Sequence, residues 1–468
     1  MTAFTKVSSF FRLFKQALKG EQQDYTSISI DRAVFLLAIP MILEMSMESV
    51  FAVVDAFWVG RMNDNDAMAT IGLTESILTL VYSIAIGLSM GATAMVARRV
   101  GEKDIKAAQV AAMQSIYIGI GLSIIVSVVG LFFSGDILRI MGASETLIEN
   151  NVGYTQWMLG GNLTIMMLFL INAVFRGAGD ASLAMRSLIL SNGLNIVLDP
   201  LFIFGFGPIP AMGVEGAAIA TTIGRGTGVL YQVYHLFNGK SLIKLTLHNI
   251  GMYGDIIVRI LKVSAGGTGQ FLIASASWIF LVRIMSTFGS AAVAGYFLAI
   301  RLIVFAILPA WGMANASATL VGQNLGAGHP DRAEKSVWRA AFLNMIFLGL
   351  VGVVFLIFAK PLLSLFTQDE EVLRNGIQCL QIVSLGYVFY AYGMVISQSF
   401  NGAGDTRTPT IINFVGFWLF QIPLAYTLAI LLDWGSPGAF AAISIAESAI
   451  AIAGILIFRQ GKWKTVKI

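Results

Sequence analysis

Three acidic residues lie close together in one strongly apolar stretch near the start of the chain. The segment PMILEMSMESVFAVVDAFWVG, residues 40–60, contains Glu44, Glu48 and Asp55. On an α-helix this spacing places the three side chains within about 40° of one another around the axis. Ionisable side chains at membrane depth are costly and by default mark a path for an ion or a substrate. We therefore expect these acids to face polar partners elsewhere in the chain.

A second group of oxygen-bearing side chains occurs in two later apolar stretches. Asn195 and Asp199 are four residues apart and project from one helix face, and Thr221 follows in the next stretch. At about 1.5 Å per residue, these three and Asp55 reach a similar depth in the outer half of a membrane. Such a set could bind a small cation such as Na⁺, or share a proton between acids that repel each other. Alternatively, Asp199 only caps or kinks its helix at Pro200, and Asp55 pairs locally.

Other ionisable side chains in apolar stretches need partners as well. Glu75 reaches a similar outer depth and could belong to the same network as Asp55. Arg225, Arg301 and Glu447 also lie inside apolar stretches, and the sequence does not name their partners.

Composition places all these groups in a membrane protein. Residues of the AVILMFWYC set make up 57% of the 468 residues and charged residues only 12%, whereas about 25% are charged in a soluble domain. The single cysteine excludes an internal disulfide. The serines have no neighbouring His within the membrane, and no phosphate-binding loop motif occurs, so the sequence predicts neither an enzyme nor an ATP-driven machine.

Apolar runs of about 20 residues predict an all-α fold with twelve transmembrane helices. The predicted spans are 33–58, 68–97, 110–133, 152–175, 183–206, 213–237, 256–284, 290–321, 336–358, 376–400, 408–432 and 437–459. With both termini on one side, that side holds 23 of the 30 basic residues, which predicts cytoplasmic termini. Residues 4–19 suit an amphipathic helix at the membrane interface, or a partly ordered tail. The positive charge therefore indicates membrane topology and no nucleic-acid partner.

An internal repeat divides the chain into two halves. FRGAGD at 175–180 and FNGAGD at 400–405 are 225 residues apart, and at the same offset 97–104 lies over 322–329. The repeat predicts two pseudo-symmetric six-helix bundles of the same orientation, with a cavity between them. The predicted domains are an N-terminal segment at 1–32, lobes at 33–237 and 256–459, a loop at 238–255 and a basic tail at 460–468.

These motifs together resemble the MATE family of multidrug exporters. The pattern Pro40, Asp55, Gly60 resembles the first-helix signature of the family, and residues 195–200 followed by 216–221 resemble its fifth and sixth helices. The resemblance implies two six-helix lobes and export of amphipathic, often cationic compounds in exchange for Na⁺ or H⁺. It also implies that Asp55, Asn195, Asp199 and Thr221 form a first-lobe cation site.

The sequence departs from one branch of the family. The NorM branch has acids in helices 7 and 10, whereas this chain has none in the interior of those helices, which suggests a DinF-like or related branch. Glu44 and Glu48 are outside the family pattern and could attract a cationic substrate or modify ion coupling.

The sequence therefore predicts a monomeric, multi-pass transporter of a bacterial inner membrane. Its partners would be the bilayer and small amphipathic substrates, with H⁺ or Na⁺ as coupling ion and no cofactor. A flippase for a lipid-linked precursor is the alternative, although only Arg225 and Arg301 could meet a pyrophosphate headgroup.

Overall fold

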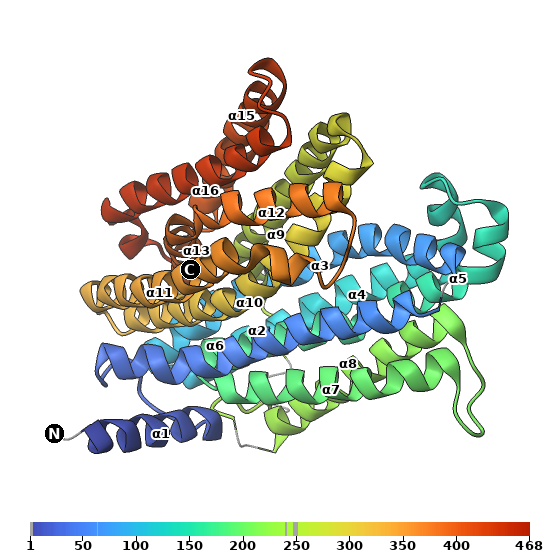
Figure 1. Cartoon of the computed structure of the whole chain (residues 1–468). Helices are drawn as coiled ribbons and strands as arrows, with labels where there is room; N and C mark the ends of the chain where they lie inside the picture. Colours follow the sequence, from blue (N-terminus) through green and yellow to red (C-terminus); the bar gives the residue numbers. More distant parts are fainter. Residues whose placement is uncertain (1–2, 63, 239–240, 247–250) are drawn as a thin grey trace. The chain divides into compact units, whose positions relative to one another are not determined.

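The computed structural model describes residues 3–62, 64–238, 241–246 and 251–468, and they are largely helical (Figure 1). The chain begins with α1 (Ala3–Lys19), whose side chains are described only from residue 11 onward. The first half continues with α2 (Ile30–Gly60), α3 (Asn65–Gly101), α4 (Ile105–Ile140), α5 (Glu145–Gly160), α6 (Asn162–Ala178), α7 (Ala181–Phe204) and α8 (Gly213–Phe237). The second half contains α9 (Gly254–Met285), α10 (Ser290–Gly326), α11 (Pro330–Leu363), α12 (Glu370–Ser384), α13 (Tyr387–Ala403), α14 (Arg407–Asn413), α15 (Ile422–Tyr426) and α16 (Ser436–Arg459).

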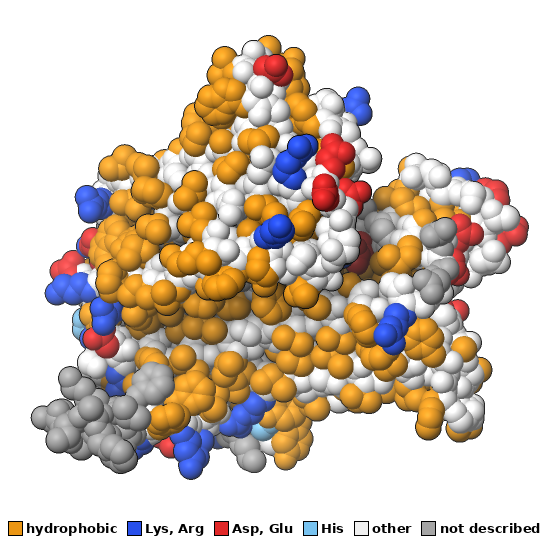
Figure 2. All heavy atoms as spheres, in the orientation of Figure 1, with side chains coloured by type: hydrophobic (Ala, Val, Ile, Leu, Met, Phe, Trp, Pro, Cys, Tyr) orange, Lys and Arg blue, Asp and Glu red, His pale blue; other side chains and the backbone are white. Residues whose placement is uncertain are grey.

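The helices have the length and surface of membrane spans. Among the described residues, ten helices are long and apolar enough to cross a membrane, and the bent pair α12–α13 would make an eleventh. The predicted sixth span coincides with α8, which is less apolar because it contains Gly, Thr and charged residues. Large apolar side chains such as Phe132 on α4 and Ile357 on α11 are exposed, and apolar atoms cover much of the face shown in Figure 2. The prediction of an all-α membrane protein is confirmed.

The internal repeat is visible as matching helices. α3 and α10 both have 37 residues, α6 and α13 both have 17, and each pair begins 225 residues apart. Gly179 (φ 89°) and Gly404 (φ 87°) end α6 and α13 in the left-handed conformation, which glycine adopts without strain. Lys103 (φ 62°) and Gly328 (φ 74°) are a second positive-φ pair at the same offset. The two halves therefore share their turns as well as their order of helices.

Two predicted spans are interrupted to different extents. The span expected at 152–175 is α5 and α6, which are separated only at Gly161 and together count as one apolar span, Glu145–Ala178. The span expected at 376–400 is α12 and α13, separated at 385–386. α12 and α13 are bent by 59° relative to each other. At Gly161 a Cβ atom would lie 2.7 Å from the Trp157 carbonyl oxygen, and at Gly386 it would lie 2.6 Å from Ser444 Oγ. The glycines allow these close approaches, and a glycine inside an apolar pattern gives no clear sequence signal of a break.

The penultimate span is irregular. Between α14 and α15 the chain forms a π-helical segment, Phe414–Gln421, and a second one follows at Thr427–Leu431. The apolar run predicts this span at 408–432, but run length does not predict hydrogen-bond pattern.

Two compact units divide the chain. Unit 1 comprises Met1–Gln23 and Leu43–Thr268, and unit 2 comprises Asp24–Ile42 and Gly269–Ile468. The division falls inside α2 and inside α9, so each of these helices contributes to both units. The lobe limits given by the sequence stay a prediction, and the loop at 238–255 lies partly outside the described residues.

In unit 1, α7 and α8 lie side by side because α8 presents glycines to α7 (Figure 1). A Cβ atom at Gly216 would lie 2.5 Å from the Phe202 carbonyl oxygen, and one at Gly224 would lie 2.8 Å from the Ser191 carbonyl oxygen. Small residues let membrane helices approach closely enough for polar side chains to bond across the interface. This packing places the polar residues of α7 against those of α8.

We predict that Gly216→Ala weakens this packing. The added methyl group meets backbone atoms of α7 that cannot rotate away, so overpacking should cost about 1–3 kcal/mol. Thermal unfolding of the purified protein in detergent should show a lower Tm. Gly193→Ala on α7 is the matched control, because no atom lies within 4 Å of the added Cβ. Equal Tm values for the two variants would contradict the role assigned to Gly216.

Candidate cation site

Three of the four residues predicted to form a cation site meet in unit 1. Asn195 Nδ2 donates hydrogen bonds to Asp199 Oδ1 (3.2 Å) and to Thr221 Oγ1 (3.1 Å). All three side chains are buried. Asn195 and Asp199 are one turn apart on α7, and Thr221 reaches them from α8. α7 continues through Pro200 to Phe204, so Asp199 does not end its helix.

Two oxygen atoms of this cluster lack a donor. Asn195 Oδ1 and Asp199 Oδ2 are buried and accept no hydrogen bond from any described residue. A buried polar atom without a partner costs free energy, and an uncompensated carboxylate costs more. A cation bound by these oxygens, or a proton on the carboxylate, would remove that cost. The cluster therefore has the chemistry of a small-cation or proton site.

Asp55 interacts with the cluster only through electrostatics. Its carboxylate is half-buried, and within the described part of the chain it makes no hydrogen bond or ion pair. It interacts electrostatically with Asp199, Glu75 and Arg225. Glu75 on α3 is exposed and interacts electrostatically with Asp55. The sequence predicts such an interaction because the two residues reach a similar depth in the membrane. We call Asp55, Asn195, Asp199 and Thr221 the outer group, after the orientation that the sequence predicts.

A middle group lies at the next level of the same helices. Arg225 is buried and donates a hydrogen bond from Nη1 to the Tyr82 hydroxyl oxygen at 2.8 Å. Its guanidinium carbon lies 5.5 Å from the Tyr82 ring centroid, and the group interacts electrostatically with Glu48 and Asp55. Asn192 on α7 donates to Glu48 Oε2 at 2.8 Å. The middle group, which consists of Glu48, Tyr82, Asn192 and Arg225, supplies the partner of Arg225 that the sequence left open.

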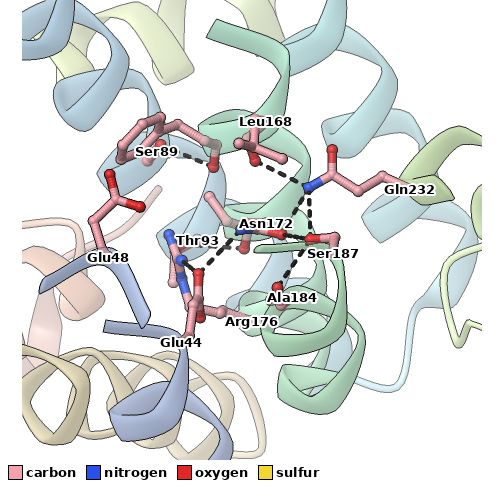
Figure 3. A network of polar contacts seen from close by, with 12 residues as sticks. Glu44, Glu48, Ser89, Thr93, Leu168, Asn172, Arg176, Ala184, Ser187 and Gln232 are labelled. Atoms are coloured by element: carbon pink, nitrogen blue, oxygen red, sulfur yellow. Dashed lines mark hydrogen bonds and ion pairs between the residues drawn. The ribbon is translucent and has the colours of Figure 1, made fainter. Parts of the chain in front are cut away.

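An inner group surrounds Glu44 (Figure 3). The Glu44 side chain is fully buried, and its Oε1 accepts hydrogen bonds from Arg176 Nη1 (2.6 Å) and Asn172 Nδ2 (3.1 Å). Asn172 Oδ1 in turn accepts from Ser187 Oγ (2.8 Å) and Gln232 Nε2 (2.7 Å). The inner group thus joins α2, α6, α7 and α8. Glu44 is not part of the outer group but forms a buried ion pair.

Sequence analysis missed the partners of Glu44. Asn172 and Arg176 lie four residues apart and therefore share one helix face. Arg176 is also part of the FRGAGD motif, which the sequence presents as a repeated turn. An arginine and an amide on one helix face, close to a turn expected at the membrane boundary, could have indicated a buried acidic partner.

In unit 2 the repeat position that corresponds to Arg176 carries an uncharged side chain. Asn401 occupies the position 225 residues after Arg176, and its amide exchanges two hydrogen bonds with Gln270 (2.9 and 3.2 Å). Glu447 on α16 is half-buried and makes no hydrogen bond or ion pair with the described residues, and Arg301 is exposed. The described residues contain no group of three or more His, Cys, Asp and Glu side chains that could hold a metal ion.

We predict that the Glu44–Arg176 pair is strongly coupled. Arg176→Gln leaves a buried carboxylate without a cation, which should cost about 3–5 kcal/mol and lower the Tm in detergent. The double variant Glu44→Gln/Arg176→Gln introduces an amide pair like the one found in unit 2 and should recover most of the loss. Arg301→Gln is the control, because its exposed side chain should contribute less than about 0.5 kcal/mol. A wild-type Tm for Arg176→Gln alone would contradict this interpretation.

Comparison with known proteins identifies the family of the chain. The family model described as MatE matches residues 40–201 and 268–427, once in each half of the chain. A Thermotoga maritima protein named "Probable multidrug resistance protein NorM" is 27% identical over 455 residues, covering 97% of each chain. The Staphylococcus aureus protein named "Multidrug export protein MepA" is 24% identical, covering 94% of this chain and 96% of that protein. A solved structure described as an outward-facing multidrug resistance MATE family transporter has a TM-score of 0.88 at 28% identity, covering 93% of this chain and 96% of that one. Because the family model covers more than half of the residues, this chain belongs to the MatE family of membrane transporters.

Proposed function

We propose that the protein exports amphipathic, cationic organic compounds in exchange for H⁺ or Na⁺. The observation that carries the proposal is the outer group, where buried oxygens of Asn195 and Asp199 lack donors and two carboxylates interact. Relatives named for multidrug resistance and multidrug export support the substrate class. The membrane would be the bacterial inner membrane, with both termini in the cytoplasm.

Neutralising the negative charge of the outer group is the proposed coupling step. With the outer group open to the outside, Asp55 and Asp199 bind a cation or a proton, which relieves their mutual repulsion and pairs the free oxygens. The neutralised site lets the outer half of α2 pack differently, the affinity for substrate falls, and the substrate leaves. Coupling requires that ion and substrate bind the two conformations unequally, because equal binding shifts no population.

Carboxylates suit the proposed substrate class. Glu48 is half-buried and interacts with Arg225, which lies over the rings of Phe51 and Tyr82, and a positive organic group is attracted by a carboxylate and by aromatic faces. A pyrophosphate-bearing lipid would meet repulsion from Asp55 and Glu48, while Arg225 already bonds Tyr82. The charge of unit 1 therefore favours a cationic substrate over a lipid-linked precursor.

The test uses the purified protein in liposomes with an imposed pH gradient or, separately, a Na⁺ gradient. Movement of a fluorescent organic cation is followed for wild type, Asp55→Asn and Asp199→Asn. Both variants should lose gradient-driven transport by at least about tenfold, since site-to-site coupling energies of about 1–3 kcal/mol correspond to roughly 5–150-fold effects. The gradient that drives wild-type transport identifies the ion.

Glu447→Gln is the matched control, because it removes a half-buried carboxylate from unit 2 and leaves the outer group unchanged. Transport that survives both aspartate substitutions would overturn the coupling site. A wild-type protein that moves no organic cation under either gradient would overturn drug export, and flipping of a lipid-linked precursor would then be assayed.

A further inference from the structure

The outer, middle and inner groups follow one another along α2 and α7, and together with Ser191 on α7 we call them the polar column. On α2, Glu48 and Asp55 are seven residues apart. On α7, Asn192, which bonds Glu48, and Asp199, which interacts electrostatically with Asp55, are also seven residues apart. The two helices are therefore in parallel register across the middle and outer groups. From Ser187 to Asp199 the column extends about 18 Å along α7, more than half of a hydrocarbon core of about 30 Å.

Buried oxygens without donors recur along the polar column. Besides Asn195 Oδ1 and Asp199 Oδ2, the described residues supply no hydrogen bond to Ser191 Oγ, Gln232 Oε1 or Glu44 Oε2. All five side chains are at most 2% exposed. Buried polar groups are normally satisfied by protein, water or a bound ion. Oxygens without donors also occur singly elsewhere among the described residues, for example Asn324 Oδ1 and Asn344 Oδ1, whereas these five follow one another along the same helices.

The charges of the polar column are unevenly distributed. In the inner group Arg176 forms an ion pair with Glu44, and in the middle group Arg225 interacts electrostatically with Glu48. The outer group contains Asp55 and Asp199 without an arginine of its own, so the excess negative charge lies there. A cation should therefore bind in the outer group. The middle and inner groups, where each acid interacts with an arginine, offer oxygen atoms with less excess negative charge. Conduction requires this combination of a site favourable enough to enter and further sites weak enough to leave.

We propose that the polar column is a hydrated path inside unit 1, by which the coupling cation moves between the outer group and the inner group. Its ligand class is a small hard cation, either a proton carried by water or Na⁺, bound by oxygen atoms. This inference rests on the proposed coupling function but assigns a new role to Ser191, Gln232 and Glu44.

Site-directed labelling tests the path without depending on transport. The chain has one cysteine, Cys379, so Cys379→Ala gives a background for single cysteines at buried serines. Ser187→Cys and Ser191→Cys lie in the column, whereas Ser115→Cys on α4 is equally buried outside it. The probe is a small methanethiosulfonate ammonium reagent, which reacts with the hydrated thiolate.

We expect labelling of the two column cysteines to be at least about tenfold faster than labelling at position 115, because only a hydrated site stabilises the thiolate. Addition of the reagent to either side of oriented vesicles shows from which side the path opens. Rates equal to that of Ser115→Cys would overturn the hydrated path.

A second measurement follows the ion itself. Gln232→Leu removes the unpaired column oxygen Oε1, far from the outer group, together with the Nε2 group that donates to Asn172. Thr74→Val, which removes a buried hydroxyl paired with Thr155, is the control for the loss of a buried hydrogen bond. Flux is measured with a pH dye inside the vesicles or with radioactive Na⁺, which separates the two cations. We expect Gln232→Leu to slow ion release by about tenfold, the scale of a site-to-site coupling energy, while substrate affinity stays within about twofold.

The two proposals can fail separately. If Asp55→Asn and Asp199→Asn transport normally, the coupling site is wrong whatever the labelling shows. If both lose transport while Gln232→Leu moves ions like wild type and column cysteines stay unreactive, only the path through unit 1 is wrong.

Discussion

The cost of placing polar groups in an apolar interior governs the structure of unit 1. A charged side chain at the centre of a bilayer is stable only beside a partner or in a hydrated space. Glu44 meets this requirement by binding Arg176 and Asn172, and Arg225 meets it through Tyr82 and neighbouring acids. Each of these contacts joins different helices, so the polar groups also fix how the helices of unit 1 pack.

The repeat shows which part of this chemistry is not required by the fold. Both halves contain the same succession of helices and the same left-handed glycines at 179 and 404. Yet in unit 2 Asn401, 225 positions after Arg176, pairs with the neutral amide of Gln270, and the residue 225 positions after Glu44 is Gly269. A neutral pair therefore suffices to hold such helices together. The acids of unit 1 exceed what packing needs, which is the reason to look for their role in ion movement.

The sequence could predict the features that depend on local pattern. Apolar run length gave the positions of the membrane helices, and a constant offset of 225 residues revealed the duplication. The depth of each residue along its helix predicts Asn195, Asp199 and Thr221 at one level of the membrane. In the structure Asn195 donates hydrogen bonds to the other two. The pairing of Glu44 with Arg176 could not be predicted in this way, because 132 residues separate them and rotation about each helix axis decides which groups face each other. The break at Gly161 depends on contacts with its surroundings and was missed for the same reason.

The position of the free oxygens argues that the polar column is more than a structural network. A network that served packing alone would gain stability from each additional hydrogen bond, so unpaired acceptors should be rare in it. In unit 1 they occur at the outer group, at Ser191 and at both Glu44 and Gln232, although donors such as Arg176 and Asn172 lie nearby. Donors are thus concentrated on one oxygen of Glu44 while the other stays free. Acceptors left open in the outer group, at Ser191 and in the inner group are what stepwise transfer of a small cation requires, because each step needs a free oxygen to receive it.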